Sequence, residues 1–218
     1  MSSKSFIPAL RFKKLTKLYD FFLRITFPEN KIKKALIEQL QLKGTETVLD
    51  FGCGTGTLSI MIKERSPNLN IIGIDVDDEI LAIAEKKILD KNLLIQLKKY
   101  DGENLPFIGN QHFDKIVSSL VFHHLPTDTK RQVFSQLYKL IKPGGELHIA
   151  DFGKPKTVYT KIAFEIFRRF DGEENTRVNA KGLLVDFIKA GGFTAVEFLK
   201  SYNTVFGTVD LLKCYSET

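Results

Sequence analysis

Val48-Leu49-Asp50-Phe51-Gly52-Cys53-Gly54-Thr55-Gly56 is the most informative stretch of this 218-residue chain. An apolar run typical of a buried strand leads into three glycines at alternate positions, and helical spacing begins directly afterwards. Glycine adopts backbone angles that other residues avoid, and it lets a ligand approach the main chain closely. Open α/β sheets bind ligands at the carboxyl ends of their strands, where this loop is expected. The pattern predicts a ligand-binding loop; a tight turn that simply requires glycine is the alternative.

The spacing of the glycines narrows the choice of ligand. Gly52 and Gly54 match the first two glycines of the dinucleotide pattern GxGxxG, but Thr57 occupies the place of the third. The phosphate-binding pattern GxxxxGK[ST] does not occur. Asp50 precedes the loop, and its carboxylate would repel a pyrophosphate but attract an ammonium or sulfonium group. The loop therefore favours a cationic ligand, with an NAD-dependent oxidoreductase as a weaker alternative.

Apolar strands and amphipathic helices alternate along the chain. Such alternation predicts an α/β fold with a mostly parallel seven-stranded sheet and helices on both faces. The last two strands have no helix between them, which predicts a C-terminal β-hairpin with one antiparallel strand. The long stretch 152–178 is expected to be irregular. The expected strands are 46–51, 70–75, 93–99, 113–120, 145–151, 195–201 and 204–214, and the expected helices are 6–27, 29–42, 58–66, 78–90, 128–142 and 180–190.

Acidic residues end two further strands at the edge that holds the glycine loop. Asp75 can accept hydrogen bonds from both hydroxyls of a ribose; capping of the next helix is the alternative, although Asp77 suits that role better. Asp101 can accept from an adenine amino group while the N–H of Gly102 serves a ring nitrogen. A simple turn is an equally good interpretation of Asp101.

Composition and charge restrict the class of protein. Apolar residues make up 43% and aromatic residues 11% of the chain, which excludes extended disorder. Two cysteines are too few for a disulfide framework or a zinc pattern, so we expect no metal and a cytoplasmic location. The first 43 residues hold ten Lys/Arg against three Asp/Glu, whereas the remainder is balanced. A uniformly basic nucleic-acid binder would not show this distribution.

In their order along the chain these features resemble the class I S-adenosylmethionine (SAM)-dependent methyltransferases. The matching stretches are VLDFGCGTG (48–56), Asp75, DGENLPF (101–107), FDKIVSSLVFHHL (113–125) and LIKPGGELHIADF (140–152). Within that class the chain is most similar to the small-molecule enzymes of ubiquinone and menaquinone biosynthesis. The resemblance implies a Rossmann-like fold, SAM as methyl donor, and a SAM-binding domain (44–218) behind an N-terminal helical cap (1–43).

The resemblance also implies a set of cofactor-binding residues. The glycine loop would hold the methionyl part of SAM, and the Asp75 and Asp101 regions would hold the ribose and the adenine. The end of the strand 113–120 would line the methionine and the substrate, and Tyr19 would close over the cofactor, although a helix tyrosine packed in the core is the ordinary alternative. In chain order the set is Tyr19, Asp50, Gly52, Cys53, Gly54, Asp75, Val76, Asp101, Gly102, Ser118 and Ser119.

Methyl displacement requires little covalent work from the protein, because alignment and exclusion of water account for much of the rate. Candidates for a catalytic base are His123, His124 and Asp151, each of which comes after a strand at its carboxyl end. A histidine titrates near neutrality and can take a proton from an attacking hydroxyl. Packing or helix entry is the alternative role for both histidines. Metal binding is disfavoured, since no carboxylate or cysteine lies at ligand spacing.

Two segments are candidates for a cover over the substrate, namely the cap 1–43 and a lid insertion near 152–178. In the insertion, basic residues surround an apolar set at helical spacing: Val158, Tyr159, Ile162, Ala163, Ile166, Phe167 and Phe170. Packing on the domain is the ordinary interpretation. The sharper one is an apolar pocket with a basic mouth, which fits a hydrophobic or anionic metabolite. The same features suit transient contact with a membrane surface.

The residues at the end of the strand 113–120 disfavour some acceptors. Amino-methylating DNA enzymes carry an Asn/Asp-Pro-Pro-aromatic run there, and this chain has Ser118-Ser119-Leu120-Val121 instead. A small-molecule substrate is therefore expected, and nucleic acid is disfavoured. A non-catalytic SAM-binding protein and an RNA or protein methyltransferase remain as alternatives.

Overall fold

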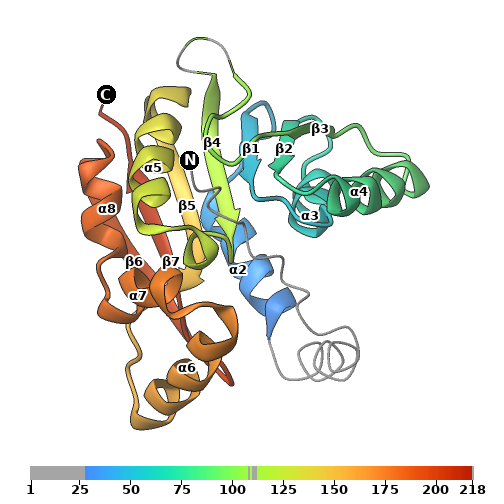
Figure 1. The fold of residues 1–218 in the computed structure, drawn as a ribbon. Helices are drawn as coiled ribbons and strands as arrows, with labels where there is room; N and C mark the ends of the chain where they lie inside the picture. Colours follow the sequence, from blue (N-terminus) through green and yellow to red (C-terminus); the bar gives the residue numbers. More distant parts are fainter. Residues whose placement is uncertain (1–27, 108, 110–111, 218) are drawn as a thin grey trace, which may run out of the picture.

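The computed structural model describes residues 28–107, 109 and 112–217. In this part of the chain seven strands form one sheet in the order β3-β2-β1-β4-β5-β7-β6 (Figure 1). Neighbouring strands pair in parallel except β7, which is antiparallel to both β5 and β6. The expected sheet with its C-terminal hairpin is confirmed. The strands are β1 (Thr47–Phe51), β2 (Asn70–Asp75), β3 (Gln96–Lys99), β4 (Phe113–Ser119), β5 (Ile141–Phe152), β6 (Ala195–Thr204) and β7 (Gly207–Tyr215).

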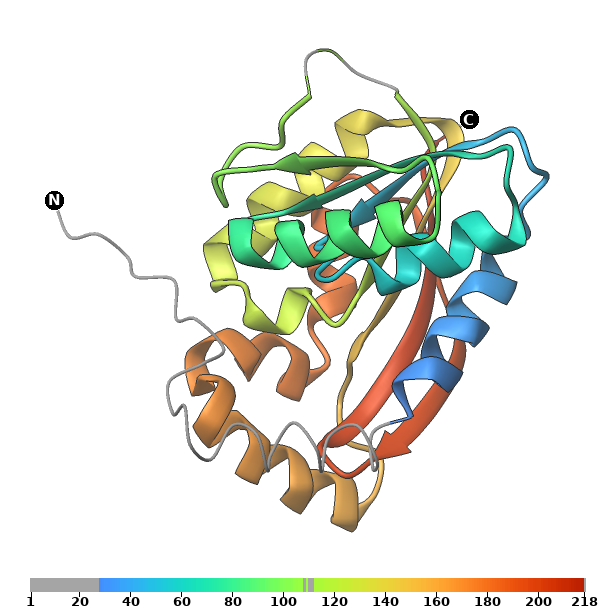
Figure 2. The same ribbon diagram turned by 90° about the vertical axis from the view of Figure 1, so that its right-hand side faces the viewer.

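Helices cover both faces of the sheet, because successive residues of the buried strands point to opposite sides. Val48 packs in the core on the side of α2 (Glu29–Leu40) and α3 (Thr57–Arg65), whereas Leu49 packs on the side of α5 (Thr127–Leu140) and α8 (Leu184–Ala190). The helix α4 (Asp78–Asp90) lies beside α3 (Figure 2). The helices α6 (Val158–Asp171) and α7 (Glu173–Lys181) come after β5, and α6 lies below the sheet in both views (Figures 1 and 2).

The helix α2 is held on the sheet by apolar and polar contacts. Ile32, Leu36, Ile37 and Leu40 are buried, as their spacing predicts. The side chain of Gln39 donates from Nε2 to the carbonyl oxygen of Leu212 at 2.7 Å, and the same atom lies 3.0 Å from Nδ1 of the buried His148. These contacts hold the end of α2 against β5 and β7. The predicted helix 6–27, and Tyr19 with it, lie outside the described residues.

The expectation that 152–178 is irregular was wrong, whereas the helical spacing noted for residues 158–170 is confirmed by α6. Thr157 and Thr160 form a reciprocal capping box that starts α6, and Gly172, with φ of 103°, ends it. The single helix expected at 180–190 was also wrong. Gly182 takes the left-handed conformation, with φ of 73°, after the end of α7, and α8 begins only at Leu184. Among the helices of the described residues, none is long and apolar enough to cross a membrane.

The strand β5 begins earlier than the expected start at residue 145. Phe113 already pairs with Ile141, and the register then shifts before Lys115 pairs with Glu146. A shift of this kind bends a strand locally and lets pairing continue on either side of it. Three other boundaries differ from the expected ones by three residues: β3 begins at Gln96 rather than 93, β6 ends at Thr204 rather than 201, and β7 begins at Gly207 rather than 204.

Candidate active site

The glycine loop after β1 is closed against the end of β2. The N–H groups of Gly52 and Cys53 both donate to the carbonyl oxygen of Ile74 at 2.9 Å. Gly52 and Gly54 are left-handed, with φ of 69° and 54°. A Cβ on Gly52 would lie 2.4 Å from Cγ2 of Val121, whereas a Cβ on Gly54 would meet nothing within 4 Å. Gly52 is therefore required by the close approach of the turn after β4, and Gly54 by backbone conformation alone.

Cys53 fills a small space under this loop. Its side chain is buried, and a Cβ on Gly73 of the neighbouring strand would lie 3.0 Å from its sulfur. Burial, together with the charges of Asp50 and Asp75, raises the pKa of the Cys53 thiol well above its ordinary value. The thiol therefore stays protonated at neutral pH and acts as a small packing group.

Asp75 holds the loop through its carboxylate. One oxygen accepts from the N–H of Gly54 at 2.8 Å, and the other accepts from the N–H of Val76 at 2.8 Å. Asp77 caps α4, because its side chain accepts from the N–H groups of Glu79 and Ile80. The prediction that Asp77 rather than Asp75 caps this helix is confirmed. Asp75 instead connects the end of β2 to the middle of the glycine loop.

Asp50 points from β1 toward α3, where its carboxylate accepts from the hydroxyl of Ser59 at 2.5 Å. Burial raises the pKa of Asp50 to about 6, although the Ser59 hydrogen bond and the positive charge of Lys33 oppose this. Because the ionised carboxylate is costly in this position, a cationic group nearby would lower its free energy. The geometry thus agrees with the preference for a cationic ligand.

Sequence analysis missed a lysine that supports the glycine loop from outside. Lys87, on α4, donates from Nζ to the carbonyl oxygen of Thr55 at 2.7 Å, to the hydroxyl of Thr57 at 2.8 Å and to that of Thr55 at 3.1 Å. Burial lowers the pKa of this lysine. The contact joins residues about thirty positions apart, and the helix pattern of α4 gives no sign of it.

Asp101 forms a turn in this structure. It is exposed, and one carboxylate oxygen accepts from the N–H groups of Asn104 at 2.7 Å and Glu103 at 2.8 Å. These two backbone hydrogen bonds, with that of Asn104 the stronger, hold the pKa of Asp101 below its usual range. Gly102 beside it has φ of 88°. Contact with an adenine remains a prediction for both residues.

The two serines at the end of β4 differ in their contacts. The hydroxyl of Ser118 donates to the carbonyl oxygen of Phe51 at 3.0 Å, so it joins β4 to β1. The hydroxyl oxygen of Ser119 is buried and has no hydrogen-bond partner among the described residues. A buried hydroxyl is costly without a partner, so Ser119 is a candidate for contact with a ligand.

His123 and Asp151 form a buried pair at the carboxyl edge of the sheet. Nδ1 of His123 lies 2.8 Å from Oδ1 of Asp151, whose other oxygen accepts from the N–H groups of Phe122 at 2.7 Å and Val121 at 3.1 Å. Burial alone would raise the pKa of Asp151, but the charge and hydrogen bond of His123 and the backbone donors hold it below its ordinary value. Asp151 is therefore an acceptor that orients His123, which argues against its predicted role as a base.

The helix α7 is bonded to this pair and to the turn η1 (Phe122–His124). Asn179 donates from Nδ2 to the carbonyl oxygen of Phe152 at 2.7 Å, and the same atom lies 3.4 Å from Oδ1 of Asp151. Asn175 donates from Nδ2 to the carbonyl oxygen of His124 at 2.8 Å. The buried Lys130 of α5 donates to the carbonyl oxygen of Asn175 at 2.5 Å. These hydrogen bonds make α7 a support of the His123–Asp151 pair.

Aromatic rings surround His123. The ring of Phe152 meets it edge-on with 4.9 Å between ring centroids, and Phe167 of α6 lies 6.0 Å away. Phe164 and Phe206 extend this aromatic cluster. The ring of His124 lies 3.9 Å from that of His123, but its side chain is exposed. The environment of His123 is thus apolar, whereas His124 faces outward.

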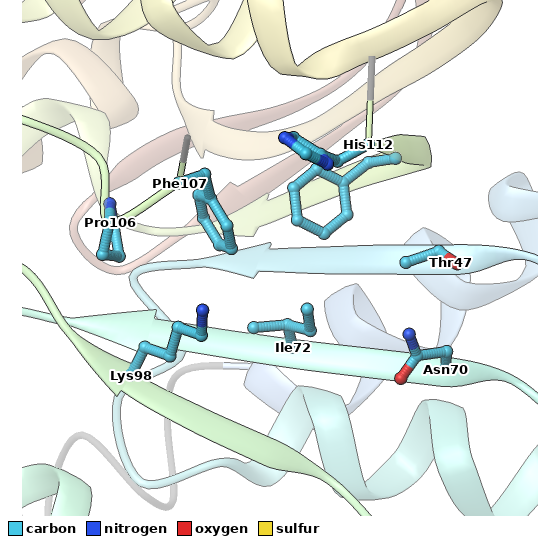
Figure 3. Close-up of a pocket in the computed structure, with 8 residues that line it drawn as sticks. Thr47, Asn70, Ile72, Lys98, Pro106, Phe107 and His112 are labelled. Atoms are coloured by element: carbon cyan, nitrogen blue, oxygen red, sulfur yellow. The ribbon is translucent and has the colours of Figure 1, made fainter. Parts of the chain in front are cut away.

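A pocket of about 500 Å³ lies elsewhere, over the amino-terminal half of β1 and β2 (Figure 3). Phe107 and His112 lie on one side of it, and Lys98, Ile72 and Asn70 lie on the other (Figure 3). None of the predicted site residues that the structure describes lines this pocket. The predicted site residues lie instead at the carboxyl ends of the strands.

Known proteins are similar in sequence to part of the chain. A family model described as a methyltransferase domain matches residues 48–145. A demethylmenaquinone methyltransferase of Lactobacillus johnsonii is 32% identical over 142 residues, which are 64% of this chain and 57% of that protein. A demethylmenaquinone methyltransferase of Thermotoga maritima is 30% identical over 160 residues, which are 72% of this chain and 67% of that protein. The chain belongs to the class I SAM-dependent methyltransferases.

The methyltransferase shares its fold with a solved relative of low sequence identity. Phosphoethanolamine N-methyltransferase 2 of Haemonchus contortus, solved in complex with S-adenosyl-L-methionine, superposes with a TM-score of 0.70 at 15% identity, over 91% of this chain and 60% of that one. SAM is the methyl donor of the enzyme, as the resemblance implied, and the NAD-dependent alternative is set aside.

Three features make the carboxyl edge a candidate for binding SAM. A Cβ on Gly54 would meet nothing within 4 Å, the hydroxyl of Ser119 lacks a partner among the described residues, and the carboxylate of Asp50, which precedes the loop, is buried. A sulfonium cation suits that carboxylate. In the part of the chain that the structure describes, no three His, Cys, Asp or Glu side chains gather where they could hold a metal ion.

Proposed function

We propose that this methyltransferase methylates a small, hydrophobic, quinone-like metabolite. The observation that carries the proposal is the aromatic cluster of Phe152, Phe164, Phe167 and Phe206 around the His123–Asp151 pair. Phe152, Phe164 and Phe167 are buried, so they make the surroundings of His123 apolar, and an apolar acceptor would be favoured beside them. The relatives named for demethylmenaquinone support the same acceptor class, although the chain spans only 57% and 67% of those two proteins.

As part of the proposal, the glycine loop and its supports hold the cofactor. Gly52, Cys53 and Gly54 would face the methionyl part of SAM, and the carboxylate of Asp75 would exchange its bond to Gly54 for the ribose hydroxyls. Asp101 with Gly102 would lie at the adenine. When bound, SAM supplies an electrophilic methyl group on a sulfonium. The rest of the catalysis falls to alignment and exclusion of water by the protein.

His123 is the proposed base. Its Nδ1 lies 2.8 Å from Oδ1 of Asp151, which fixes the ring orientation, and the imidazole would take the proton of an acceptor hydroxyl. Asp151 would keep this tautomer and stabilise the protonated ring. Asn179 would hold Asp151 and the end of β5 in place. SAM would supply the methyl group and leave as S-adenosylhomocysteine, while His123 would hold the proton that the acceptor hydroxyl gives up.

We also propose that α6 and α7 form the lid over this edge, and that residues 1–43 form a cap on a SAM-binding domain of residues 44–218. The three hydrogen bonds from Asn175, Asn179 and Lys130 support a lid that is anchored at α7. The two cysteines are free and buried, which supports a cytoplasmic location.

The test is a methyl-transfer assay with isotopically labelled SAM and a short-chain demethylmenaquinone in its reduced form. We expect label in the quinone product. Asp75→Ala should weaken binding of S-adenosylhomocysteine in calorimetry. His123→Gln should lower kcat by roughly a hundredfold and remove the acidic limb of the pH profile, with binding of S-adenosylhomocysteine unchanged.

His124→Gln is the matched control, because it changes an adjacent but exposed imidazole. A loss of kcat with His124→Gln and none with His123→Gln would overturn the assignment of the base. Label that enters added RNA or protein, but no quinone, would instead favour the alternative acceptors. Binding of S-adenosylhomocysteine without transfer to any acceptor would favour a non-catalytic SAM-binding protein.

A further inference from the structure

The helix α6 has an apolar face that the described part of the chain leaves exposed. Val158 is 78% exposed, Tyr159 and Ile162 are each 58% exposed, and Ile166 is 55% exposed. Positions 159, 162 and 166 have the spacing of one helix face, and Val158 borders it. From the sequence, these residues were expected to pack on the domain, to line a substrate pocket or to contact a membrane surface transiently. For these four side chains, packing on the domain was the wrong interpretation.

The opposite face of α6 fixes the helix in this orientation. Phe164 is almost fully buried and Phe167 is buried beside it, both in contact with Phe152. The capping box of Thr157 and Thr160 sets the first turn, and a Cβ on Gly207 would lie 2.9 Å from the ring of Phe164. The outer apolar face therefore cannot turn inward without breaking a packed core. A contiguous exposed patch of this kind marks a contact site.

The charges around the outer face indicate what it contacts. Lys161 and Arg169 line a shallow groove of about 450 Å³ with Ile162 and Ile166, and Lys154 precedes the helix. The carboxylate of Glu165 also lines this groove, but it accepts from the guanidinium of Arg168 at 2.8 Å, so its charge is compensated. Apolar side chains between basic ones are typical of helices that lie in the interface of an anionic membrane.

We propose that the outer face of α6, formed by Val158, Tyr159, Ile162 and Ile166 with Lys161 and Arg169, docks the protein on the surface of an anionic lipid membrane. The apolar side chains enter the region between headgroups and acyl chains, and the two basic side chains contact lipid phosphates. The helix lies flat, because its inner face stays packed on the domain. The inference extends the proposed function and rests on it, since a quinone-like acceptor dissolves in the lipid phase.

The test uses a fluorescent label on α6. The two native cysteines are buried, so a cysteine introduced as Ile162→Cys in the full chain can be labelled selectively with an environment-sensitive dye. The labelled protein is titrated with vesicles of phosphatidylcholine and phosphatidylglycerol, and with vesicles of phosphatidylcholine alone. We expect a blue shift with the anionic vesicles and at least tenfold weaker binding to the neutral ones.

Matched variants distinguish binding through this face from nonspecific adsorption to the vesicles. Leu94→Cys places the same dye at a leucine that is 85% exposed after α4, and it should show no shift. In co-sedimentation of unlabelled protein, Lys161→Glu with Arg169→Glu should reduce binding to anionic vesicles at least tenfold. Ile166→Glu should act in the same direction, whereas Leu94→Glu should leave binding unchanged.

Three outcomes would overturn the inference. Equal shifts at positions 162 and 94 would show nonspecific adsorption. A dye at position 162 that is already blue-shifted without lipid would show that another part of the chain or a second copy covers the face, and the sedimentation coefficient would tell these apart. A wild-type protein that does not bind the vesicles but methylates a water-soluble quinone would refute the docking proposal and leave the proposed function intact. Lipid binding without methyl transfer would instead sink the proposed acceptor class and leave docking standing.

Discussion

Replacing Gly52 by alanine probes the contact between the glycine loop and the turn after β4. A new Cβ would lie 2.4 Å from Cγ2 of Val121, and the residue would keep a left-handed φ of 69°. The left-handed conformation costs about 1–2 kcal/mol for a residue other than glycine. Overpacking against Val121 adds about 1–3 kcal/mol. We expect Gly52→Ala to lower the free energy of unfolding by about 2–5 kcal/mol.

Gly54→Ala is the matched control in the same loop. Its φ of 54° is also left-handed, but the new Cβ would meet nothing within 4 Å. Gly54→Ala should therefore lower the free energy of unfolding only by the cost of the left-handed conformation, about 1–2 kcal/mol. Adding Val121→Ala to Gly52→Ala should recover roughly 1–3 kcal/mol of the loss relative to additivity, because the two methyl groups that clash are gone.

The assay is urea unfolding followed by circular dichroism, with calorimetric titration of S-adenosylhomocysteine on each variant. Equal losses for Gly52→Ala and Gly54→Ala would refute the steric part of this reasoning. Strict additivity in the double mutant would refute it as well, since the contact with Val121 would then carry no energy. A normal affinity for S-adenosylhomocysteine in Gly52→Ala would show that the loop shape is not needed for the cofactor.

Two further predictions concern the supports of the loop. Burial raises the pKa of Asp50 to about 6, so the stability linked to its neutral form is present below about pH 4 and is lost as the pH rises through about 6. Asp50→Asn should raise the free energy of unfolding at about pH 8 by about 3 kcal/mol and weaken binding of S-adenosylhomocysteine, and equal stability at that pH would contradict the raised pKa. Lys87→Met removes three hydrogen bonds to Thr55 and Thr57, so it should cost about 1–2 kcal/mol in urea unfolding and weaken the ligand several-fold. Lys91→Met, which breaks an exposed pair with Glu64, should change both quantities little; equal effects of the two lysine variants would contradict the role of Lys87.

The sequence predicted the elements where one local signal fixes each boundary. The helix 78–90 was placed correctly because Asp77 caps its start, and β2 because its apolar run ends at Asp75. The glycine pattern marked the loop because left-handed backbone there requires glycine. At these positions a few neighbouring residues determine the local structure.

The features that the sequence did not predict depend on contacts between residues far apart in the chain, and local sequence patterns do not reveal such contacts. Lys87 reaches Thr55 across thirty-two positions, and Asn179 reaches Asp151 across twenty-eight. Helical spacing in α6 indicated an apolar stripe but not which part of it is buried, because both faces of the helix carry large apolar residues. Only the packing of Phe164 and Phe167 on Phe152 decides that orientation.

The position of Cys53 determines how the enzyme tolerates oxidants. Peroxide attacks the thiolate form of cysteine, and the sulfenic acid that results would add an oxygen atom beneath the cofactor loop. Burial keeps the thiol of Cys53 protonated and limits the access of peroxide to its sulfur. The thiol of Cys53 is therefore expected to be less sensitive to oxidation than an exposed cysteine thiolate. An enzyme built in this way should keep its affinity for S-adenosylhomocysteine through a peroxide exposure that modifies proteins with exposed thiolates.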